Sequence, residues 1–272
     1  MSASIEANIA SGPSRWRPPS IFGGVVARRA AWGIALAYVV WSISDLSIDW
    51  SRVAQGLPRA LDLFGRMFPP DFGRWELLLR GMTESLQMAI AATLFGALLS
   101  IPLGLCAAAN LAPRPVYIVA RGLLTLLRSF HEVIIAIFFV KIFGFGPVAG
   151  LLTLILGSAI FLAKTLAEDI ENMRPGSAEA IRATGASFAQ LVVYAIVPQV
   201  LSRTLGVWIY RLDANLRHST VVGIVGAGGI GQTLSASFSR YDFDFSLAIL
   251  LSIAALVALG EWFSDWLRSR LQ

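Results

Sequence analysis

The sequence predicts an all-α integral membrane protein with about six transmembrane helices. The 272-residue chain is 56% hydrophobic and only 14% charged, and its mean hydropathy is +0.68. A soluble domain of this length would need far more polar surface. Six spans of about 20 residues each, with short loops between them, account for the length. The composition therefore leaves no room for a separate soluble domain.

Cysteine, histidine and net charge exclude several other classes of protein. Cys106 is the single cysteine, and it forms no familiar metal-ligand spacing with His131 and His218. The net charge of +5 fits the basic loops that orient membrane proteins, and no basic patch interleaved with aromatic residues indicates a nucleic-acid site. We therefore expect no intrachain disulfide, and no metal, cofactor or nucleic acid bound to this chain.

The amino-terminal part of the chain divides into a tail and a first membrane segment. Residues 1–29 are polar, are rich in Ser, Pro and Gly, and lack the pattern of a signal peptide, so we expect a cytoplasmic tail. Residues 30–80 hold a first span over about Ala30–Ile48, and then the segment Trp50–Arg80, which mixes charged and apolar residues. That segment is too charged to span, and we predict an amphipathic segment and loop at the outer interface.

Residues 81–272 form the predicted transmembrane core, with a polar cytoplasmic loop at residues 171–198. Arginines at the proposed inner ends of the spans predict that both termini are cytoplasmic. The middle of the second core span is charged, so we expect that helix to be tilted, bent or broken. The five apolar runs of the core cover about Met82–Asn110, Val116–Phe143, Val148–Leu166, Pro198–Val225 and Phe243–Phe263.

The loop sequence EAIRATGASFAQLVVYAIVP, residues 179–198, predicts two short helices joined by a turn. Glu179 and Arg182 fall on one helix face. Gly185 permits a sharp turn because glycine has no Cβ, and Pro198 suits the first turn of the next helix. On the residues alone, an ordinary cytoplasmic helical hairpin is an equal alternative.

The same segment resembles the EAA loop of ABC-importer permeases. Glu179, Ala180, Gly185 and Pro198 stand at the spacing of that family, while its second alanine is replaced by Ile181. Ala195 and Val197 also replace the residues usual there. The resemblance implies that this loop carries the coupling helices that dock on a separate ATPase subunit. The implied coupling residues are Glu179, Ala180, Arg182, Gly185 and Pro198.

Charged residues inside the apolar runs are the candidates for a substrate pathway. An arginine at mid-membrane costs roughly 2.5–3.5 kcal/mol on insertion scales, so each needs a partner or a wet cavity. Asp213 and Arg217 are four residues apart and could pair, while Arg211 and Asn215 share a neighbouring face. One hypothesis is an ion pair that packs two subunits, and the other is a polar path for an anionic substrate.

The earlier span carries a similar charged group. Arg128 and Glu132 are also four residues apart, and their spacing predicts that they pair. His131 is either a hydrogen-bonded core histidine or a cavity residue. Together the candidate pathway residues are Arg128, His131, Arg211, Asp213, Asn215 and Arg217.

A second resemblance narrows the family. The run YRLDANLRHSTVVGIVGAGGIGQ, residues 210–232, is similar to phosphonate-type permeases, and methionine-type permeases share its glycine-rich end. RSFHEVIIAIFF, residues 128–139, also resembles them, although that family usually has proline where His131 stands. The resemblance implies a MetI-like, type-I ABC importer permease for phosphonate, phosphite or hypophosphite. A methionine-type or other small-substrate importer is the alternative.

The resemblance also implies partners. A second permease subunit, identical or related, would complete one pathway, two ATPase subunits would bind ATP and Mg, and a periplasmic or lipid-anchored binding protein would deliver substrate. The sequence itself has no Walker A phosphate loop, so this chain needs a separate ATPase. A membrane-bound oxidoreductase and a self-sufficient channel or carrier are the competing classes.

The run GAGGIG contains the GxGxxG spacing, but its setting differs from a dinucleotide-binding motif. That motif follows a strand and lies in a βαβ unit, whereas a membrane span precedes this run. We instead predict a flexible turn or a close helix contact at the outer mouth. The glycines concerned are Gly226, Gly228, Gly229 and Gly231.

Overall fold

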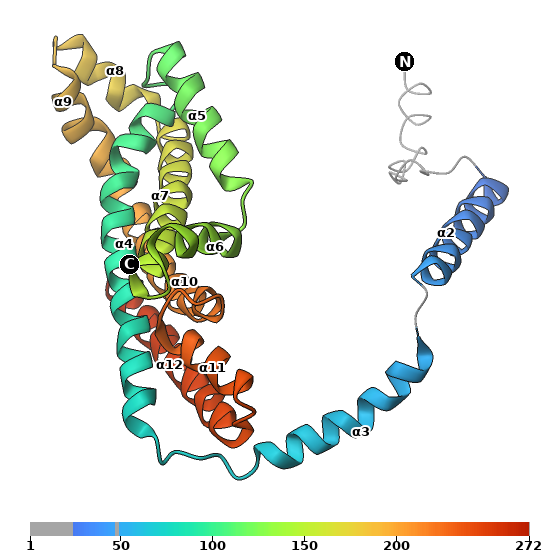
Figure 1. Ribbon diagram of the computed structural model, residues 1–272. Helices are drawn as coiled ribbons and strands as arrows, with labels where there is room; N and C mark the ends of the chain where they lie inside the picture. Colours follow the sequence, from blue (N-terminus) through green and yellow to red (C-terminus); the bar gives the residue numbers. More distant parts are fainter. Residues whose placement is uncertain (1–23, 47–48, 272) are drawn as a thin grey trace, which may run out of the picture. The chain divides into compact units, whose positions relative to one another are not determined.

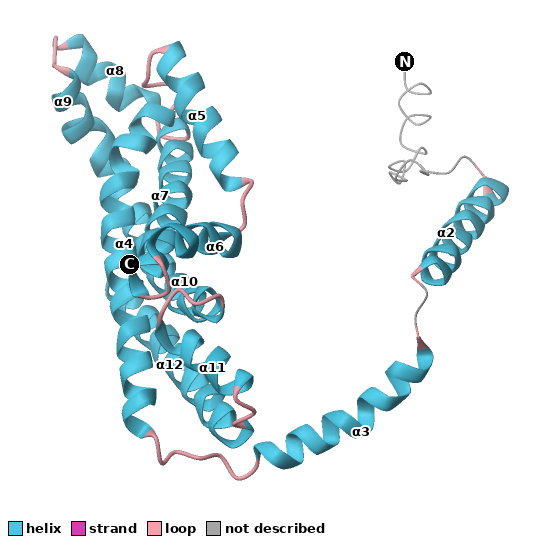
Figure 2. Cartoon of the chain, in the orientation of Figure 1, coloured by secondary structure: helices cyan, strands magenta, loops and turns pink. Residues whose placement is uncertain are grey.

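The computed structural model describes residues 24–46 and 49–271. Within these ranges all regular elements are helices, as Figure 2 shows. This confirms the predicted all-α class. Most of the predicted cytoplasmic tail, and Ile48 at the predicted end of the first span, lie outside the described residues.

The chain divides into two compact units, residues 1–61 and residues 62–272. The first unit contains α2 (Val25–Asp45) and most of α3 (Trp50–Met67). Helix α2 starts before the predicted Ala30, and it includes Arg28 and Arg29, which were assigned to the tail from the sequence. The Asp49 carboxylate accepts hydrogen bonds from the backbone N–H groups of Ser51 and Arg52, and so caps the start of α3.

Helix α3 has an apolar stripe and a basic stripe along its length. Arginines recur every seven residues from Arg52 to Arg66, and most of the large apolar side chains of the helix are solvent-exposed, whereas Met67 at its end is buried. This pattern agrees with the amphipathic segment predicted there. Its position at a membrane interface stays a prediction.

The second unit contains the remaining helices, which are labelled in Figure 1. In chain order they are α4 (Trp75–Ala107), α5 (Arg114–Arg128), α6 (Glu132–Phe143), α7 (Pro147–Glu171), α8 (Pro175–Ala183), α9 (Phe188–Leu191), a π-helical turn (Val192–Ile196), α10 (Val197–Ile224), α11 (Gly229–Ser239) and α12 (Phe243–Leu271).

Four helical segments among the described residues are each long and apolar enough to cross a membrane, and the number rises to six if two bent helix pairs are each one span. The prediction of about six spans corresponds to this upper number. The four are Trp75–Ala107, Pro147–Glu171, Phe188–Ser239 and Phe243–Arg270.

Three of the predicted span ends differ from the ends of the corresponding helices. Helix α4 begins at Trp75, not near Met82, and it ends at Ala107, not at Asn110. Helix α7 continues beyond the predicted end at Leu166 to Glu171. At the start of α4 and at the end of α7, charged residues were taken as the end of a span, but such residues are compatible with helix and only end the apolar stretch.

The long span around Arg128 is broken, as its charged middle predicted. Helices α5 and α6 meet at an angle of 89°, and in Figure 1 α6 lies across α7. His131 is the N-cap of α6, because its Nδ1 atom accepts a hydrogen bond from the backbone N–H of Val133 at 3.3 Å. The break therefore brings the start of α6 into the interior of the bundle.

Helices α4 and α7 form the central packed pair, and small residues line their contact. A Cβ atom on Gly96 would lie 2.5 Å from the Cβ of Ser158, and a Cβ on Gly104 would lie 2.9 Å from a methyl of Leu166. Small residues allow membrane helices to approach closely and so gain van der Waals packing. This close pair holds in place the polar residues of α7 that face α10.

We predict that Gly96→Leu destabilises the bundle. The leucine side chain overlaps Ser158 of α7, and overpacking of this kind typically costs about 1–3 kcal/mol or more. The amount of protein in membranes and its melting temperature in detergent should both fall. Gly122→Leu is the matched control, because a Cβ on Gly122 meets no atom within 4 Å; equal losses in both variants would contradict the packing argument.

Candidate functional site

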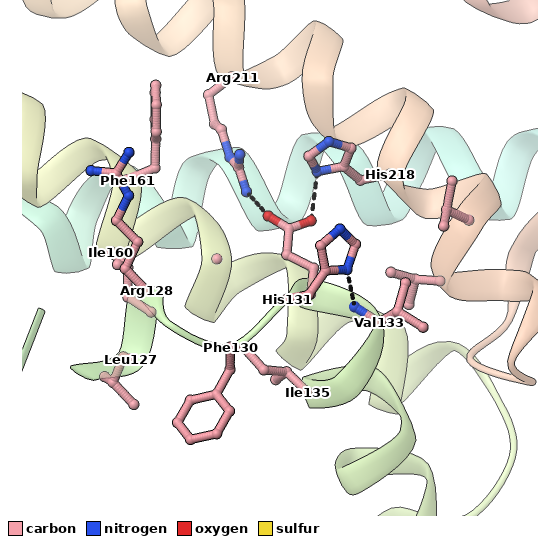
Figure 3. A pocket seen from close by; sticks show the side chains of 14 residues that line it. Leu127, Arg128, Phe130, His131, Val133, Ile135, Ile160, Phe161, Arg211 and His218 are labelled. Carbon is pink, nitrogen blue, oxygen red and sulfur yellow. Dashed lines mark hydrogen bonds and ion pairs between the residues drawn. The ribbon is translucent and has the colours of Figure 1, made fainter. Parts of the chain in front are cut away.

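A cavity of about 540 Å³ opens at the break between α5 and α6. Helices α5, α6, α7 and α10 supply its walls. Its polar side chains are Arg128, His131, Glu132, Arg211 and His218, and Figure 3 shows His131, Arg211 and His218 close together, with Arg128 set apart from them. The cavity thus combines one acidic group with four basic side chains inside an apolar bundle.

Arg211 is the most buried of the basic side chains, with 6% of its side chain exposed. Its Nη2 atom lies 2.6 Å from Oε1 of Glu132, and its Nε donates a hydrogen bond of 3.0 Å to Oγ of Ser158. The guanidinium carbon lies 5.5 Å from the centre of the Phe161 ring. A counter-charge, a hydroxyl and an aromatic face together compensate the burial of this cation.

Glu132 bridges two basic groups. Besides Arg211, its second oxygen lies 2.5 Å from Nδ1 of His218. A Cβ atom on Gly157 would come within 2.6 Å of Oε1 of Glu132 and 3.0 Å of Nη2 of Arg211. Only glycine at position 157 therefore leaves room for the pair between α6 and α10.

The predicted pair between Arg128 and Glu132 was wrong. Their spacing of four residues brings side chains together only on one continuous helix, and the chain turns by 89° between these two residues. Glu132 therefore points to Arg211 and His218 of α10. Within the described residues no carboxylate pairs with Arg128, which lines the same cavity from the end of α5.

Behind Arg211, a buried hydrogen-bond network joins α4, α7 and α10. The Asn215 side-chain N–H₂ group donates to Thr93 Oγ1 at 2.9 Å and to Ser158 Oγ at 2.9 Å. Asn215 and Ser158 are fully buried. Asn215 therefore does not line the cavity; it fixes Ser158, which in turn positions Arg211.

Asp213 and Arg217 lie on another face of α10, and they pair as their spacing predicted. Arg217 contacts the Asp213 carboxylate through one nitrogen and Glu261 of α12 through the other, each at 2.5 Å. Neither Asp213 nor Arg217 is among the residues that line the cavity. Their arrangement joins α10 to α12.

The glycine-rich run packs against α4 and α7. Gly226, Gly228 and Gly229 have positive φ angles of 91°, 87° and 71°, which residues with a Cβ rarely adopt. The backbone N–H of Gly229 donates to Glu84 Oε1 at 2.9 Å. Gly231 is buried in the first turn of α11. The run therefore forms both a turn and a close helix contact, and its place at the outer mouth stays a prediction.

The candidate coupling loop folds into α8, a turn and α9. Gly185 makes the turn with a φ angle of 77°, and Ser187 and Gln190 form a capping box at the start of α9. Glu179, Ala180 and Arg182 are exposed on α8.

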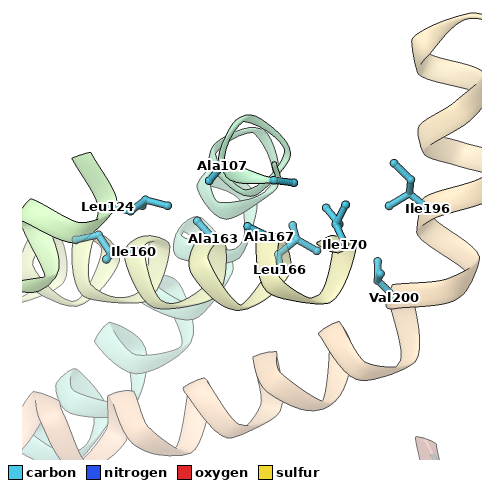
Figure 4. Close-up of a cluster of buried hydrophobic side chains, with 10 residues drawn as sticks. Ala107, Leu124, Ile160, Ala163, Leu166, Ala167, Ile170, Ile196 and Val200 are labelled. Carbon is cyan, nitrogen blue, oxygen red and sulfur yellow. The ribbon is translucent and has the colours of Figure 1, made fainter. Parts of the chain in front are cut away.

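The π-helical turn joins α9 to α10, whose first turn contains Pro198. A cluster of buried apolar side chains holds this junction to the C-terminal end of α7, with Ile196 and Val200 packed near Ile170 (Figure 4). The loop is therefore attached by its far end to the core while α8 keeps an exposed face.

The sequence pattern missed His218, Ser158 and Gly157 as parts of the site. His218 could have been found, because it stands seven residues after Arg211 and seven residues return to the same helix face. Ser158 and Gly157 carry no such signal within an apolar run. Their role depends on which helix packs against which.

The fold and the site together define a multi-pass membrane permease of helical type with a charged interior. Residues 100–272 match the family model described as the binding-protein-dependent transport system inner membrane component. The chain belongs to this family, the permease subunits of ABC transporters. Such subunits work with separate ATPase and binding-protein partners and have no ATPase activity of their own.

The chain is also similar to individual permease proteins of other bacteria. The chain is 41% identical over 226 residues to the phosphite transport system permease protein PtxC of Stutzerimonas stutzeri, which covers 83% of this chain and 82% of that one. It is 38% identical over 238 residues to the phosphate-import permease protein PhnE of Mycolicibacterium smegmatis. That match covers 86% of this chain but only 44% of the longer relative.

A solved structure confirms the MetI-type fold. The inward-facing MetNI methionine ABC transporter matches with a TM-score of 0.64 and 25% identity. The match covers 74% of this chain and 99% of the other. The helical core described above is therefore an importer permease core.

We predict that Arg217→Ala lowers stability more than it affects any substrate step. It leaves the Asp213 carboxylate, 7% exposed, without its partner. Breaking a fully buried pair costs about 3–5 kcal/mol, and this pair should cost less because 40% of the Arg217 side chain is exposed. Membrane abundance and melting temperature should fall, and Asp213→Asn in the same chain should restore them. Normal abundance with lost uptake would instead indicate a pathway role.

Proposed function

We propose that this permease imports a phosphorus oxyanion: a phosphonate, or a smaller relative such as phosphite or hypophosphite. The observation that carries the proposal is the cavity in which Arg128, His131, Arg211 and His218 gather inside the bundle. A tetrahedral oxyanion needs several converging donors and positive charge. The names of two relatives, phosphite transport and phosphate import, support the same class of substrate.

In this proposal the substrate pathway passes the cavity at the start of α6. Arg128 and His131 are exposed there, whereas Arg211 forms the deeper wall. Asn215 supports Arg211, and Asp213 with Arg217 holds α10 against α12. Of the six residues predicted for the pathway, Arg128, His131 and Arg211 line the cavity and keep that role in the proposal. The remaining three residues have a supporting role.

The proposed assembly has two permease subunits, this chain with an identical or related copy, and two ATPase subunits that bind ATP and Mg. A periplasmic or lipid-anchored binding protein delivers the anion to the outer mouth near the glycine-rich run. The chain lies in the bacterial cytoplasmic membrane with both termini on the cytoplasmic side. Closure of the ATPase dimer moves the coupling loops and switches the pathway between outward and inward access.

Helix α8 and the turn after it form the proposed ATPase-docking surface. Glu179, Ala180, Arg182 and Gly185 are exposed together, and a hollow of about 420 Å³ lies beside them, lined by Thr184 and other turn residues. Leu191 and Ala195 are buried in a small apolar cluster with Ala178 of α8. A displacement of α8 would therefore be transmitted through packed side chains to α10, which carries Arg211.

A methionine-type importer is the second candidate, favoured by the MetNI match. Methionine is a zwitterion with an apolar side chain, so its site needs one acidic and one basic partner beside an apolar pocket. The present cavity has four basic side chains against Glu132. The excess of basic groups favours an anion.

We predict that deletion of the gene abolishes growth on one reduced or carbon-bound phosphorus source and leaves growth on phosphate intact. The strain is grown on phosphate, methylphosphonate, phosphite or hypophosphite as the only phosphorus source, with a plasmid copy as the control. The lost source identifies the substrate. Equal growth on all four, after other importers are deleted, would reject the oxyanion and favour the methionine candidate.

We predict that Gly185→Pro and Glu179→Lys uncouple transport. Proline cannot adopt the positive φ angle of position 185, and lysine reverses the charge on the proposed docking face. Uptake should fall to background while the protein reaches the membrane in normal amounts. Gly176→Ala is the matched control, because a Cβ on Gly176 meets no atom within 4 Å and its φ is not positive. Normal uptake in either variant would exclude the coupling role of that residue.

A further inference from the structure

Two of the four basic groups in the cavity are already bound to an acid of the same chain. Glu132 uses one oxygen for Arg211 and the other for His218, and in Figure 3 the side chains of Arg211 and His218 point toward the same part of the cavity. An incoming anion therefore does not meet a free guanidinium at Arg211. The import of an anion through this cavity must therefore change the contacts of Glu132 as well.

We propose that Glu132 is an internal competitor of the substrate: its carboxylate occupies the anion-binding position between Arg211 and His218, and the substrate oxyanion must displace it. This inference rests on the proposed import of a phosphorus oxyanion and adds to it the residue that sets the affinity of the site. The competitor has the chemistry of the ligand, an anionic group with oxygen acceptors.

The geometry favours displacement of Glu132 over simple addition of a second anion. Gly157 closes the cavity behind the pair, because even a Cβ there would lie 2.6 Å from Oε1 of Glu132. A second anion beside the intact pair would therefore lie close to the carboxylate, and like charges at contact distance repel strongly inside a bundle. An XO₃ group in place of the carboxylate can instead accept from both Arg211 and His218. Its third oxygen is then free for Arg128 or His131.

The place of Glu132 in the chain allows it to move. It is the first residue of α6, directly after the break, and 21% of its side chain is exposed to the cavity. Arg211, in contrast, is fixed by Ser158 and Phe161 on its other sides. The acid can thus swing away while the base stays in position.

A competitor of this kind also explains how one site can bind and release the same anion. While the carboxylate is displaced, the substrate compensates the charge of Arg211. When the carboxylate returns, it restores the pair and expels the substrate, so Arg211 is never left without a counter-charge. Such competition weakens binding, because the apparent Kd equals the intrinsic Kd divided by the fraction of molecules in which the donors are free.

The test is equilibrium binding of radiolabelled phosphite and methylphosphonate to the permease, co-purified with its ATPase subunits in lipid nanodiscs. We expect Glu132→Gln to bind roughly tenfold more tightly than wild type, if the donors are free in about one molecule in ten. The same variant should import more slowly, because release is no longer assisted. A merely structural role would weaken binding and could not produce the opposite changes in affinity and rate.

Two further variants keep the test decisive. Glu132→Asp retains the charge that Arg211 needs for assembly, but its shorter side chain cannot reach both donors, so its affinity should be intermediate. Glu261→Gln is the matched control: it removes a carboxylate of α12 that pairs with Arg217 of α10 outside the cavity, and should bind as wild type does. If Glu132→Gln does not assemble, the affinity of Glu132→Asp tests the proposal in its place.

The inference is overturned if assembled Glu132 variants bind the oxyanions as weakly as, or more weakly than, wild type. It is also overturned if wild-type cells import an oxyanion but no assembled complex, wild type or variant, binds one. The proposed function fails in a different way: wild-type cells import none of the phosphorus oxyanions, whatever the variants do. The two failures are therefore distinguished by uptake in wild-type cells.

Discussion

A guanidinium inside a membrane-spanning bundle needs a counter-charge, and Arg211 obtains it from Glu132. Several other features serve this one contact. The break before α6 brings Glu132 inward, Gly157 leaves space for the pair, and Ser158 orients the guanidinium. An unpaired arginine there would be costly to insert. The pair thus stabilises the bundle and at the same time defines the position at which an anion can bind.

The candidate coupling loop is joined directly to the helix that lines the cavity. Helix α10 carries Arg211 and His218, and it begins directly after the π-helical turn that follows α9. The apolar cluster with Ile196 and Ile170 joins this junction to α7. Movement of an ATPase-bound loop would therefore act on α7 and α10, the two helices that form the wall behind Glu132. This continuity is the physical basis for proposed coupling between nucleotide state and anion binding.

Much of the fold followed from the sequence, because apolar runs of membrane length and glycine-proline turns are local features. The EAA-like segment and the arginines of α10 were also visible as patterns. The pairing of Glu132 with Arg211 and His218 was not visible in the sequence. Helical spacing pairs it with Arg128, and that rule fails where the chain turns by 89°. Gly157 and Ser158 were missed for a similar reason, since only the packing of α7 against α10 gives an ordinary glycine and serine their roles.

Uptake of radiolabelled phosphite in cells that express Arg128→Gln shows whether the basic cavity carries an oxyanion. Arg128 lines the cavity, and within the part of the chain that the structure describes no carboxylate depends on it. We expect a large loss of uptake at normal membrane abundance. Lys141→Gln, which removes a cation from the far end of α6, should transport normally. Unchanged uptake in Arg128→Gln would mean that the anion does not pass through this cavity.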